Sequence, residues 1–336
     1  MRRSLGLLSI VLCLAPLAGC GGDGGSSSEN ELTIYSGRNE KLVGRLIDSF
    51  GRKSGVKVKV RYGESAELAA TIAEEGDNSP ADVFFSQDAG ALGAVEDSLA
   101  PLPATLTNAV PERFRDPRGR WSGTSARARV VAFSTERVQE RELPDSIFGF
   151  TEPRWKGKVG FAPPNASFQA FVSGMRLDVG DARTKQWLAA IKRNKPKLYD
   201  NNIQTVEAIA RGEVDVGFVN HYYLYELRAE RPDLPVRNHW LRPGDPGSLV
   251  NVAGTGILSS TEHKPQAERF VRFLQGREAQ TYFAQKTFEY PLTAGVQPIR
   301  GLPPLRRVVG PGFALGKLGG ELRGTLRMLE EAGFST

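Results

Sequence analysis

The strongest candidates for chemistry in this chain are two adjacent tyrosines, Tyr222 and Tyr223, within the sequence run NHYYLY at residues 220–225. They follow an apolar run, residues 214–219, that is typical of a buried strand. Ligands of α/β folds bind where the carboxyl end of a strand opens into a helix. The free N–H groups at a helix start also favour anionic groups. We therefore expect a binding site at this point of the chain.

Adjacent phenols can bind a metal ion together if both lose their protons. A free phenol has a pKa of about 10, so a hard trivalent ion would have to displace the protons by coordination. Ligation by oxygen alone also selects hard cations over the soft metals that Cys and Met prefer. Alternatively, Tyr222 and Tyr223 are half-buried aromatics that line a cleft for a sugar or a polyamine. The chemistry of the two residues leaves both interpretations open.

The motifs of common enzymes are missing from the sequence. It contains no GxxxxGK[ST], GxSxG, CxxC or HExxH run. Of the three histidines, we interpret His239 and His263 as surface or structural residues, and His221 belongs to the tyrosine run. Because no nucleophile–base pair is evident, the sequence predicts a binding protein and not an enzyme.

Length and composition exclude several other classes. The 336 residues are 40% apolar and 24% charged, with a net charge of +6, which is ordinary for a folded protein. This length predicts two lobes. One apolar stretch alone, at the N-terminus, approaches the length of a membrane span, which argues against an integral membrane protein. Without Arg2 and Arg3 the net charge is 42 − 38 = +4, too small to indicate nucleic-acid binding.

The N-terminus has the pattern of an export signal. Arg2 and Arg3 precede an apolar stretch at residues 5–17, and the segment ends in LAGC, which resembles the lipobox of bacterial lipoproteins. We predict a signal peptide over residues 1–19 and a lipidated Cys20, followed by a flexible Gly/Ser-rich tether to residue 30. An ordinary secretory signal is the alternative. The prediction is an exported, extracytoplasmic protein held at the cell membrane by lipid.

The rest of the chain predicts alternating strands and helices. The first half of the pattern is a strand at 32–35, a helix at 42–50, a strand at 56–60, a helix at 65–75 and a strand at 82–85. Further strands are expected at 129–133, 159–162, 214–219 and 249–258, and further helices at 170–177, 183–191, 266–274 and 321–332. In the last helix we expect Leu322, Leu326 and Leu329 to share a face, with Gly333 at the C-cap. The pattern predicts a mainly parallel α/β fold with right-handed crossovers.

Seven short runs then give a specific resemblance. They are IYSGR at 34–38, EEG at 74–76, SPADVFFSQ at 79–87, WKGKVG at 155–160, GEVD at 212–215, NHYY at 220–223 and FEYPL at 288–292. On these runs the chain resembles the ferric-ion-binding proteins of bacterial iron ABC importers, which have the type II periplasmic binding protein fold. The resemblance implies two lobes, each a mainly parallel sheet flanked by helices, that close on a hinge.

The resemblance also implies a division of the chain. The N-lobe would cover residues 31–128, the C-lobe 129–250, a return to the N-lobe 251–300, and a C-terminal loop and helices 301–336. We expect the hinge strands near residues 129–133 and 251–256.

The site implied by the resemblance combines iron, tyrosines and an anion. The phenolates that bind iron in the family correspond to Tyr222 and Tyr223. Contacts to a synergistic anion, phosphate or carbonate, correspond to Asn165, Ala166, Ser167, Asn202, Asn220 and Arg127. Most of these offer neutral or cationic donors, the kind that an oxyanion needs. By residue type alone, Asn165 can also be a turn residue and Asn202 a helix N-cap.

The N-lobe ligands of other family members are not present here. Where relatives have a histidine or a glutamate, this chain has Asn39 and Gln87, and Asp88 follows. We take all three as candidate N-lobe contacts, although Asp88 can equally be a solvated surface acid. A third tyrosine of some members corresponds to Asn165.

The full prediction is a monomeric lipoprotein that captures Fe³⁺ through the tyrosine pair, an anion and water. It would deliver the ion to an inner-membrane ABC permease. The alternative is the same fold with another solute: an organophosphonate, a polyamine or an iron chelate.

Overall fold

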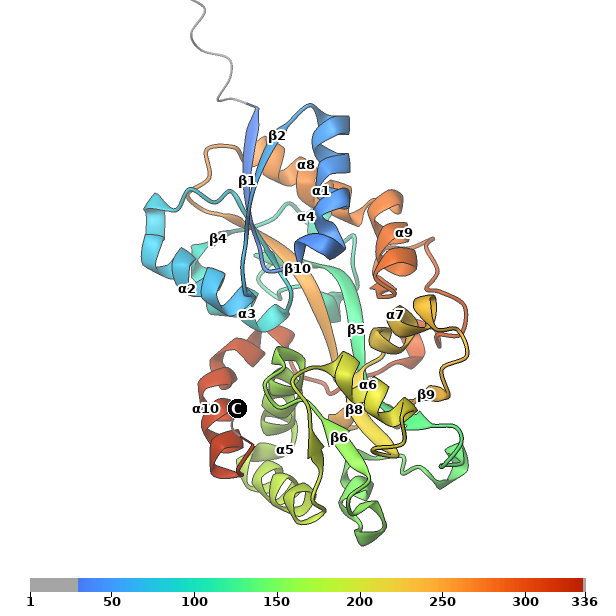
Figure 1. Ribbon diagram of the computed structural model, residues 1–336. Coiled ribbons are helices and arrows are strands. Elements are labelled where there is room, and N and C mark those ends of the chain that lie inside the picture. Colours follow the sequence, from blue (N-terminus) through green and yellow to red (C-terminus); the bar gives the residue numbers. More distant parts are fainter. Residues whose placement is uncertain (1–29, 335–336) are drawn as a thin grey trace, which may run out of the picture.

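The computed structural model describes residues 30–334 (Figure 1). The predicted signal peptide, Cys20 and nearly all of the predicted tether lie outside the described residues. Between residues 30 and 334, no helix is both long and apolar enough to cross a lipid bilayer.

The strands of the described residues form one continuous sheet in the order β2-β1-β3-β10-β5-β8-β6-β7, with β4 beside β10 and with β9 and β11 beside β5. Their bounds are β1 Glu31–Ser36, β2 Lys57–Tyr62, β3 Val83–Ser86, β4 Leu99–Ala100, β5 Trp121–Ser134, β6 Val159–Phe161, β7 Lys197–Leu198, β8 Val216–Asn220, β9 Val236–His239, β10 Val250–Leu258 and β11 Tyr290–Pro291. The expected strands are all present, whereas β4, β7, β9 and β11 were not predicted.

The helices flank this sheet. Their bounds are α1 Glu40–Ser54, α2 Ser65–Glu75, α3 Ala89–Ala94, α4 Ala104–Thr107, α5 Ala166–Arg193, α6 Asn202–Ala210, α7 Tyr222–Glu230, α8 Lys264–Gln275, α9 Arg277–Lys286 and α10 Leu318–Glu331. The two helices expected at 170–177 and 183–191 are the halves of α5, which bends at Gly180, where φ is 82°.

The predicted α/β fold is confirmed, and the sheet as a whole is mixed, with a parallel group of strands in each lobe and antiparallel strands added to it. Strands β1, β2 and β3 pair in parallel, as do β6, β7 and β8. Strands β5 and β10, however, are antiparallel to every strand they pair with. These are also the two strands that run between the upper and the lower lobe in Figure 1.

Alternation along the strands divides each lobe into two apolar layers. In β3, Val83 and Phe85 face α1, α8 and α9, whereas Phe84 faces α2 and α3. In β5, Val131 and Phe133 face α5, whereas Val130 and Ala132 face α6 and α7. Side chains that point alternately to opposite faces are the expected result of the two-residue period of a strand.

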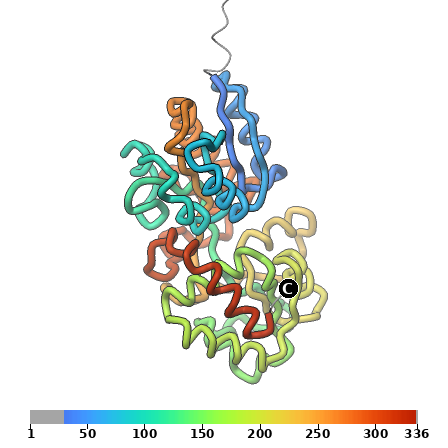
Figure 2. Tube along the Cα trace, turned by 90° about the vertical axis from the view of Figure 1, so that its left-hand side faces the viewer, coloured from blue at the N-terminus to red at the C-terminus, as the bar shows by residue number. Residues whose placement is uncertain are grey.

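The C-terminal helix α10 contacts both lobes, through α3 and through α5 (Figure 2). Its buried face differs from the predicted one, because Leu326 is 45% exposed while Leu318, Thr325, Met328 and Leu329 are buried. Thr325 faces α5, where its hydroxyl lies 2.8 Å from the hydroxyl of Ser173, and the next residue, Leu326, therefore faces outward. Gly333 follows the helix with φ 70°, as its predicted C-cap role requires.

Candidate metal and anion site in the interlobe cleft

A cavity of about 570 Å³ lies between the lobes. One side, which we call the donor wall, consists of Arg129, Ser167, Asn220, Tyr222 and Tyr223. The opposite side, which we call the acidic wall, consists of Glu64, Glu67, Gln87 and Asp88. Arg127, Asn165, Ala166 and Asn251 are among the other lining residues. The structure therefore brings together most of the residues that the sequence singled out.

The tyrosine pair begins α7, directly after β8 ends. The two rings lie 4.2 Å apart between centroids, with an angle of 34° between their planes. Tyr222 is buried and Tyr223 is half-buried. Burial, and after it the neighbouring Tyr223, raises the pKa of Tyr222 well above its usual value of 10. A cation must therefore bind at the oxygen before Tyr222 can act as a phenolate.

His221 fixes the start of this helix. Its Nδ1 accepts the N–H of Ala128 at 3.1 Å, so its Nε2 donates to the carbonyl oxygen of Phe288 at 3.0 Å. Burial lowers the pKa of the imidazole to about 4, so the ring is neutral at physiological pH. The ring thus ties β5 and the loop before β11 to the residue that precedes the tyrosines.

Arg129 is the strongest cationic feature of the donor wall. It is 4% exposed, and it donates to the Phe218 carbonyl at 2.8 Å, to Ser167 Oγ at 3.2 Å and to Asn220 Oδ1 at 3.4 Å. Burial lowers its pKa to about 9, which still leaves it charged near neutral pH. Each of these partners is uncharged, and no carboxylate among residues 30–334 forms an ion pair with it. A buried guanidinium with neutral partners is suited to bind an anion.

Ser167 connects the start of α5 with Arg129. Asn165 is the N-cap of α5, since its Oδ1 accepts the N–H of Ser167 at 3.0 Å and the Ser167 hydroxyl at 2.5 Å. Asn202 donates to Ser167 Oγ at 3.4 Å from a buried position that does not line the cavity. The N-cap of α6 is Asn201, so the alternative role of Asn202 as a cap is wrong.

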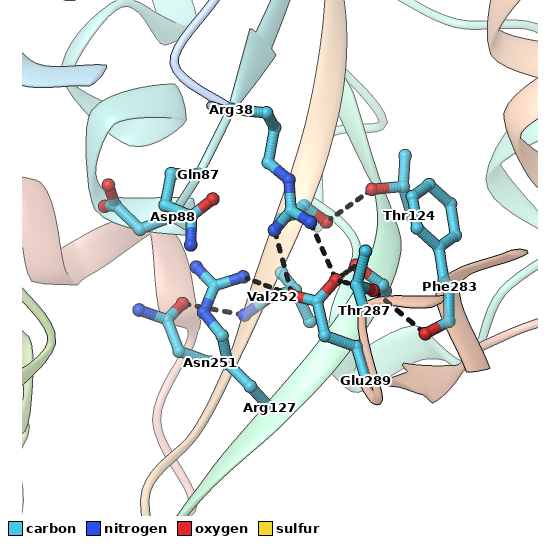
Figure 3. Close-up of polar contacts among 12 residues, drawn as sticks. Arg38, Gln87, Asp88, Thr124, Arg127, Asn251, Val252, Phe283, Thr287 and Glu289 are labelled. Atoms are coloured by element: carbon cyan, nitrogen blue, oxygen red, sulfur yellow. Dashed lines mark hydrogen bonds and ion pairs between the residues drawn. The ribbon is translucent and has the colours of Figure 1, made fainter. Parts of the chain in front are cut away.

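Arg127 faces the cleft but is shared with a buried acid, Glu289 (Figure 3). Its Nη1 lies 3.5 Å from Glu289 Oε1. Burial opposes a charge on Glu289, yet the ion pair and hydrogen bonds with Arg38 outweigh burial and lower its pKa to about 2. Arg127 is therefore partly neutralised, in contrast to Arg129.

The acidic wall is less organised. Asp88 caps α3, where its Oδ1 accepts the N–H of Ala91 at 3.0 Å. Among residues 30–334, no three His, Cys, Asp or Glu side chains gather as a metal site. Asn39 is exposed, caps α1 through the N–H of Lys41 and does not line the cavity. The structure therefore brings Gln87 and Asp88 to the cleft but not Asn39.

Two residues that the sequence analysis did not single out matter most to the charge of the site: Arg129, which lines the cavity, and Glu289, which lies behind Arg127. Arg129 had a signal, because residues two apart on a strand share a face and Arg127 was already a candidate. Glu289 and its main partner Arg38 both lie in runs that carry the resemblance, at 288–292 and 34–38, but nothing in the sequence pairs them across 251 residues of chain.

With this geometry established, comparison with known proteins gives the family. The family of bacterial extracellular solute-binding proteins matches residues 77–300, and the chain belongs to it. Its fold is that of the type II periplasmic binding proteins. The relatives are solute-binding proteins and not enzymes, which confirms both the resemblance seen in the sequence and the prediction of a binding protein.

Among curated relatives, the "Major ferric iron-binding protein" of Neisseria meningitidis serogroup B is 32% identical over 314 residues, covering 90% of this chain and 93% of that protein. The "Fe(3+)-binding periplasmic protein" of Serratia marcescens is 31% identical over 92% of each chain. The structure of iron-bound HitA from Pseudomonas aeruginosa is similar, with a TM-score of 0.82 and 32% identity over 90% of this chain and 99% of that one. The Trichodesmium protein IdiA (FutA), in complex with iron and citrate, has a TM-score of 0.79 and 29% identity over 91% of this chain and 100% of that one.

Proposed function

We propose that this protein captures Fe³⁺ as cargo, with Tyr222 and Tyr223 as phenolate ligands and an oxyanion beside them. The observation that supports the proposal best is the tyrosine pair in one cleft with Arg129. This arginine is buried and has no carboxylate partner in the part of the chain that the structure describes. The ferric iron named for the relatives from Neisseria and Serratia is the same cargo.

The donor wall divides the chemistry between the metal and the anion. Fe³⁺ is a hard cation and displaces the phenol protons that burial otherwise retains on Tyr222. The anion, phosphate or carbonate, would accept from Arg129 and from the N–H of Ala166 at the start of α5, with Asn220 beside them. Ser167 would join them by turning its hydroxyl from Asn165 Oδ1 to the anion, with Asn202 behind it. Water and the anion complete the coordination, because the acidic wall offers no organised ligand set.

Delivery follows from the two-lobed fold. Strands β5 and β10 connect the lobes, so we infer that the hinge lies in them and that the lobes divide near residues 128 and 250. A loaded, closed monomer would present a different surface to an ABC permease than an open one. Cys20 would hold the protein at the outer side of the cell membrane by its lipid.

The test is a visible absorption titration of iron-stripped protein with ferric citrate and, separately, with ferric nitrilotriacetate, each in phosphate and in bicarbonate buffers. A tyrosinate-to-iron charge-transfer band that saturates at one iron per chain is the expected result. A band in one buffer only identifies the anion, and a band that needs citrate identifies a chelate as cargo. No band under any of these conditions would overturn the proposal, leaving a solute-binding protein with a different cargo.

A further inference from the structure

Glu289 is the centre of a buried charge cluster that includes Arg127, which lines the cleft (Figure 3). It is 2% exposed and lies on the segment between α9 and β11. Both of its oxygens accept from Arg38, at 2.9 and 2.7 Å. Oε2 also accepts from Thr287 at 2.7 Å and from Ser125 at 3.1 Å. The carboxylate is therefore well satisfied without Arg127.

Arg127 is the loosest member of the cluster. Its contact with Glu289, at 3.5 Å, is the longest of the set, and it is the one hydrogen bond found for its side chain in the described residues. Arg127 is also the member that lines the cavity, whereas Arg38, Thr287 and Glu289 do not. In β5 it lies opposite Asn251 of β10, at the level where the strands pass between the lobes.

The Arg127 guanidinium therefore has two possible acceptors: the Glu289 carboxylate, which it contacts in this structure, and an anion bound in the cavity that it lines. If Arg127 leaves Glu289, the carboxylate keeps both bonds from Arg38 and the two hydroxyl bonds, so no buried acid is left without partners. If an anion enters the cleft, Arg127 gains a second acceptor on its open side. The more strongly Glu289 attracts Arg127, the less of the arginine's charge is available to the anion.

We propose that Glu289 is a positioning residue that competes with the bound oxyanion for Arg127 and thereby sets how tightly the anion is held. Arg38, Thr287 and Ser125 determine how strongly Glu289 competes, because each donor they supply makes Arg127 less necessary to it. The inference rests on the anion site of the proposed function, but it can be measured without iron.

The experiment is calorimetric titration of the iron-free protein with inorganic phosphate, in a double-mutant cycle. Glu289→Gln removes the competing charge and is expected to tighten phosphate binding about tenfold, within the range of coupled charged neighbours. The gain must disappear when Arg127→Gln is added. A matched control is Glu75→Gln, which removes another N-lobe carboxylate with hydroxyl partners, bonded to Tyr35 and Ser79 away from the cleft. It should leave phosphate affinity unchanged.

A second variant covers the case in which Glu289→Gln does not fold. Thr287→Val removes one donor from Glu289, so the carboxylate should hold Arg127 more tightly and phosphate should bind about threefold more weakly. A merely structural role would also weaken binding in Thr287→Val. The variant is therefore repeated together with Arg127→Gln, where the proposal expects its effect to vanish and a structural role would leave it in place. Where Glu289→Gln folds, the proposal also requires opposite signs for Glu289→Gln and Thr287→Val.

The inference is overturned if Glu289→Gln leaves phosphate affinity unchanged, or if its gain persists with Arg127→Gln, since Glu289 would then act by long-range charge alone. An unchanged affinity in Thr287→Val, or a wild-type protein that binds no phosphate, would also overturn it. If the tyrosinate-to-iron band is absent but the double-mutant cycle on phosphate affinity gives the expected result, the proposed function is contradicted and this inference still holds.

Discussion

The two walls of the cleft differ in how far their side chains are fixed before any cargo arrives. On the donor wall, Arg129 has three bonded partners and Ser167 is held by Asn165 and Asn202. On the acidic wall, Glu64 makes no cap bond although it stands at the N-cap of α2, and Asp88 is engaged in capping α3. The donor wall is organised for a ligand, and the acidic wall mainly contributes charge and helix ends.

The difference indicates where binding free energy is concentrated. Groups held in place by their neighbours lose little freedom when a ligand arrives, whereas exposed acids must be ordered first. We therefore expect variants of the donor wall to affect affinity and variants of the acidic wall to affect mainly stability.

The largest expected effect comes from the tyrosines. Tyr222→Phe or Tyr223→Phe removes a metal ligand, and iron affinity should fall by more than about 100-fold, since loss of groups behind a metal ligand already costs up to that much. Competition titration against a chelator would measure it, and the band should weaken in parallel. Tyr225→Phe, on the same helix but outside the cavity, is the control. Full iron affinity in both cleft variants would contradict the site.

Arg129 should give the next largest effect. Arg129→Gln removes charged hydrogen bonds to the anion, so the phosphate affinity of iron-free protein should fall about 10- to 100-fold. Arg113→Gln is the matched control, because Arg113 is another arginine bonded to backbone carbonyl oxygens, at a distance from this cleft. Equal losses in the two variants would show that the donor wall does not bind phosphate through Arg129.

The acidic wall should respond differently. Asp88→Ala removes the cap of α3 and should cost about 1 kcal/mol of unfolding free energy. Iron affinity should change less than threefold, on the order of the loss of a surface charge interaction. Chemical denaturation and the iron titration measure the two quantities. A large loss of iron affinity with intact stability would make Asp88 a metal ligand and would remove the contrast between the walls.

The last expected effect concerns stability alone and should appear only in acid. Arg38 keeps the pKa of Glu289 near 2 against burial, compared with an ordinary value of 4.5. The charged carboxylate therefore stabilises the fold above pH 4.5, and this contribution is lost as the pH falls toward 2. Urea unfolding of iron-free protein at several pH values should show a shallower acid decline for Glu289→Gln than for the wild type. Parallel declines would contradict the assigned charge of Glu289.

Much of the fold was predictable because it depends on local patterns. The period-two run at residues 56–60 and the helix at 65–75 are encoded by side chains a few residues apart, and the structure has β2 and α2 there. The mixed direction of the sheet was not predictable, because strand direction across β5 and β10 depends on how the chain passes between the lobes. Leu326 was misjudged for a similar reason: a Ser173–Thr325 contact across two helices decided which face is buried.

The site divides in the same way. By itself the sequence determined the tyrosine pair and its place between a strand and a helix, because residue type and short-range order are properties of the chain. Only the tertiary structure decided that Arg129 bonds uncharged partners while Arg127 is shared with Glu289, and that Asn39 caps a helix away from the cleft. The balance of charge in a buried site depends on which groups the fold brings within a few ångströms, and Arg38 and Glu289 meet across 251 residues of chain.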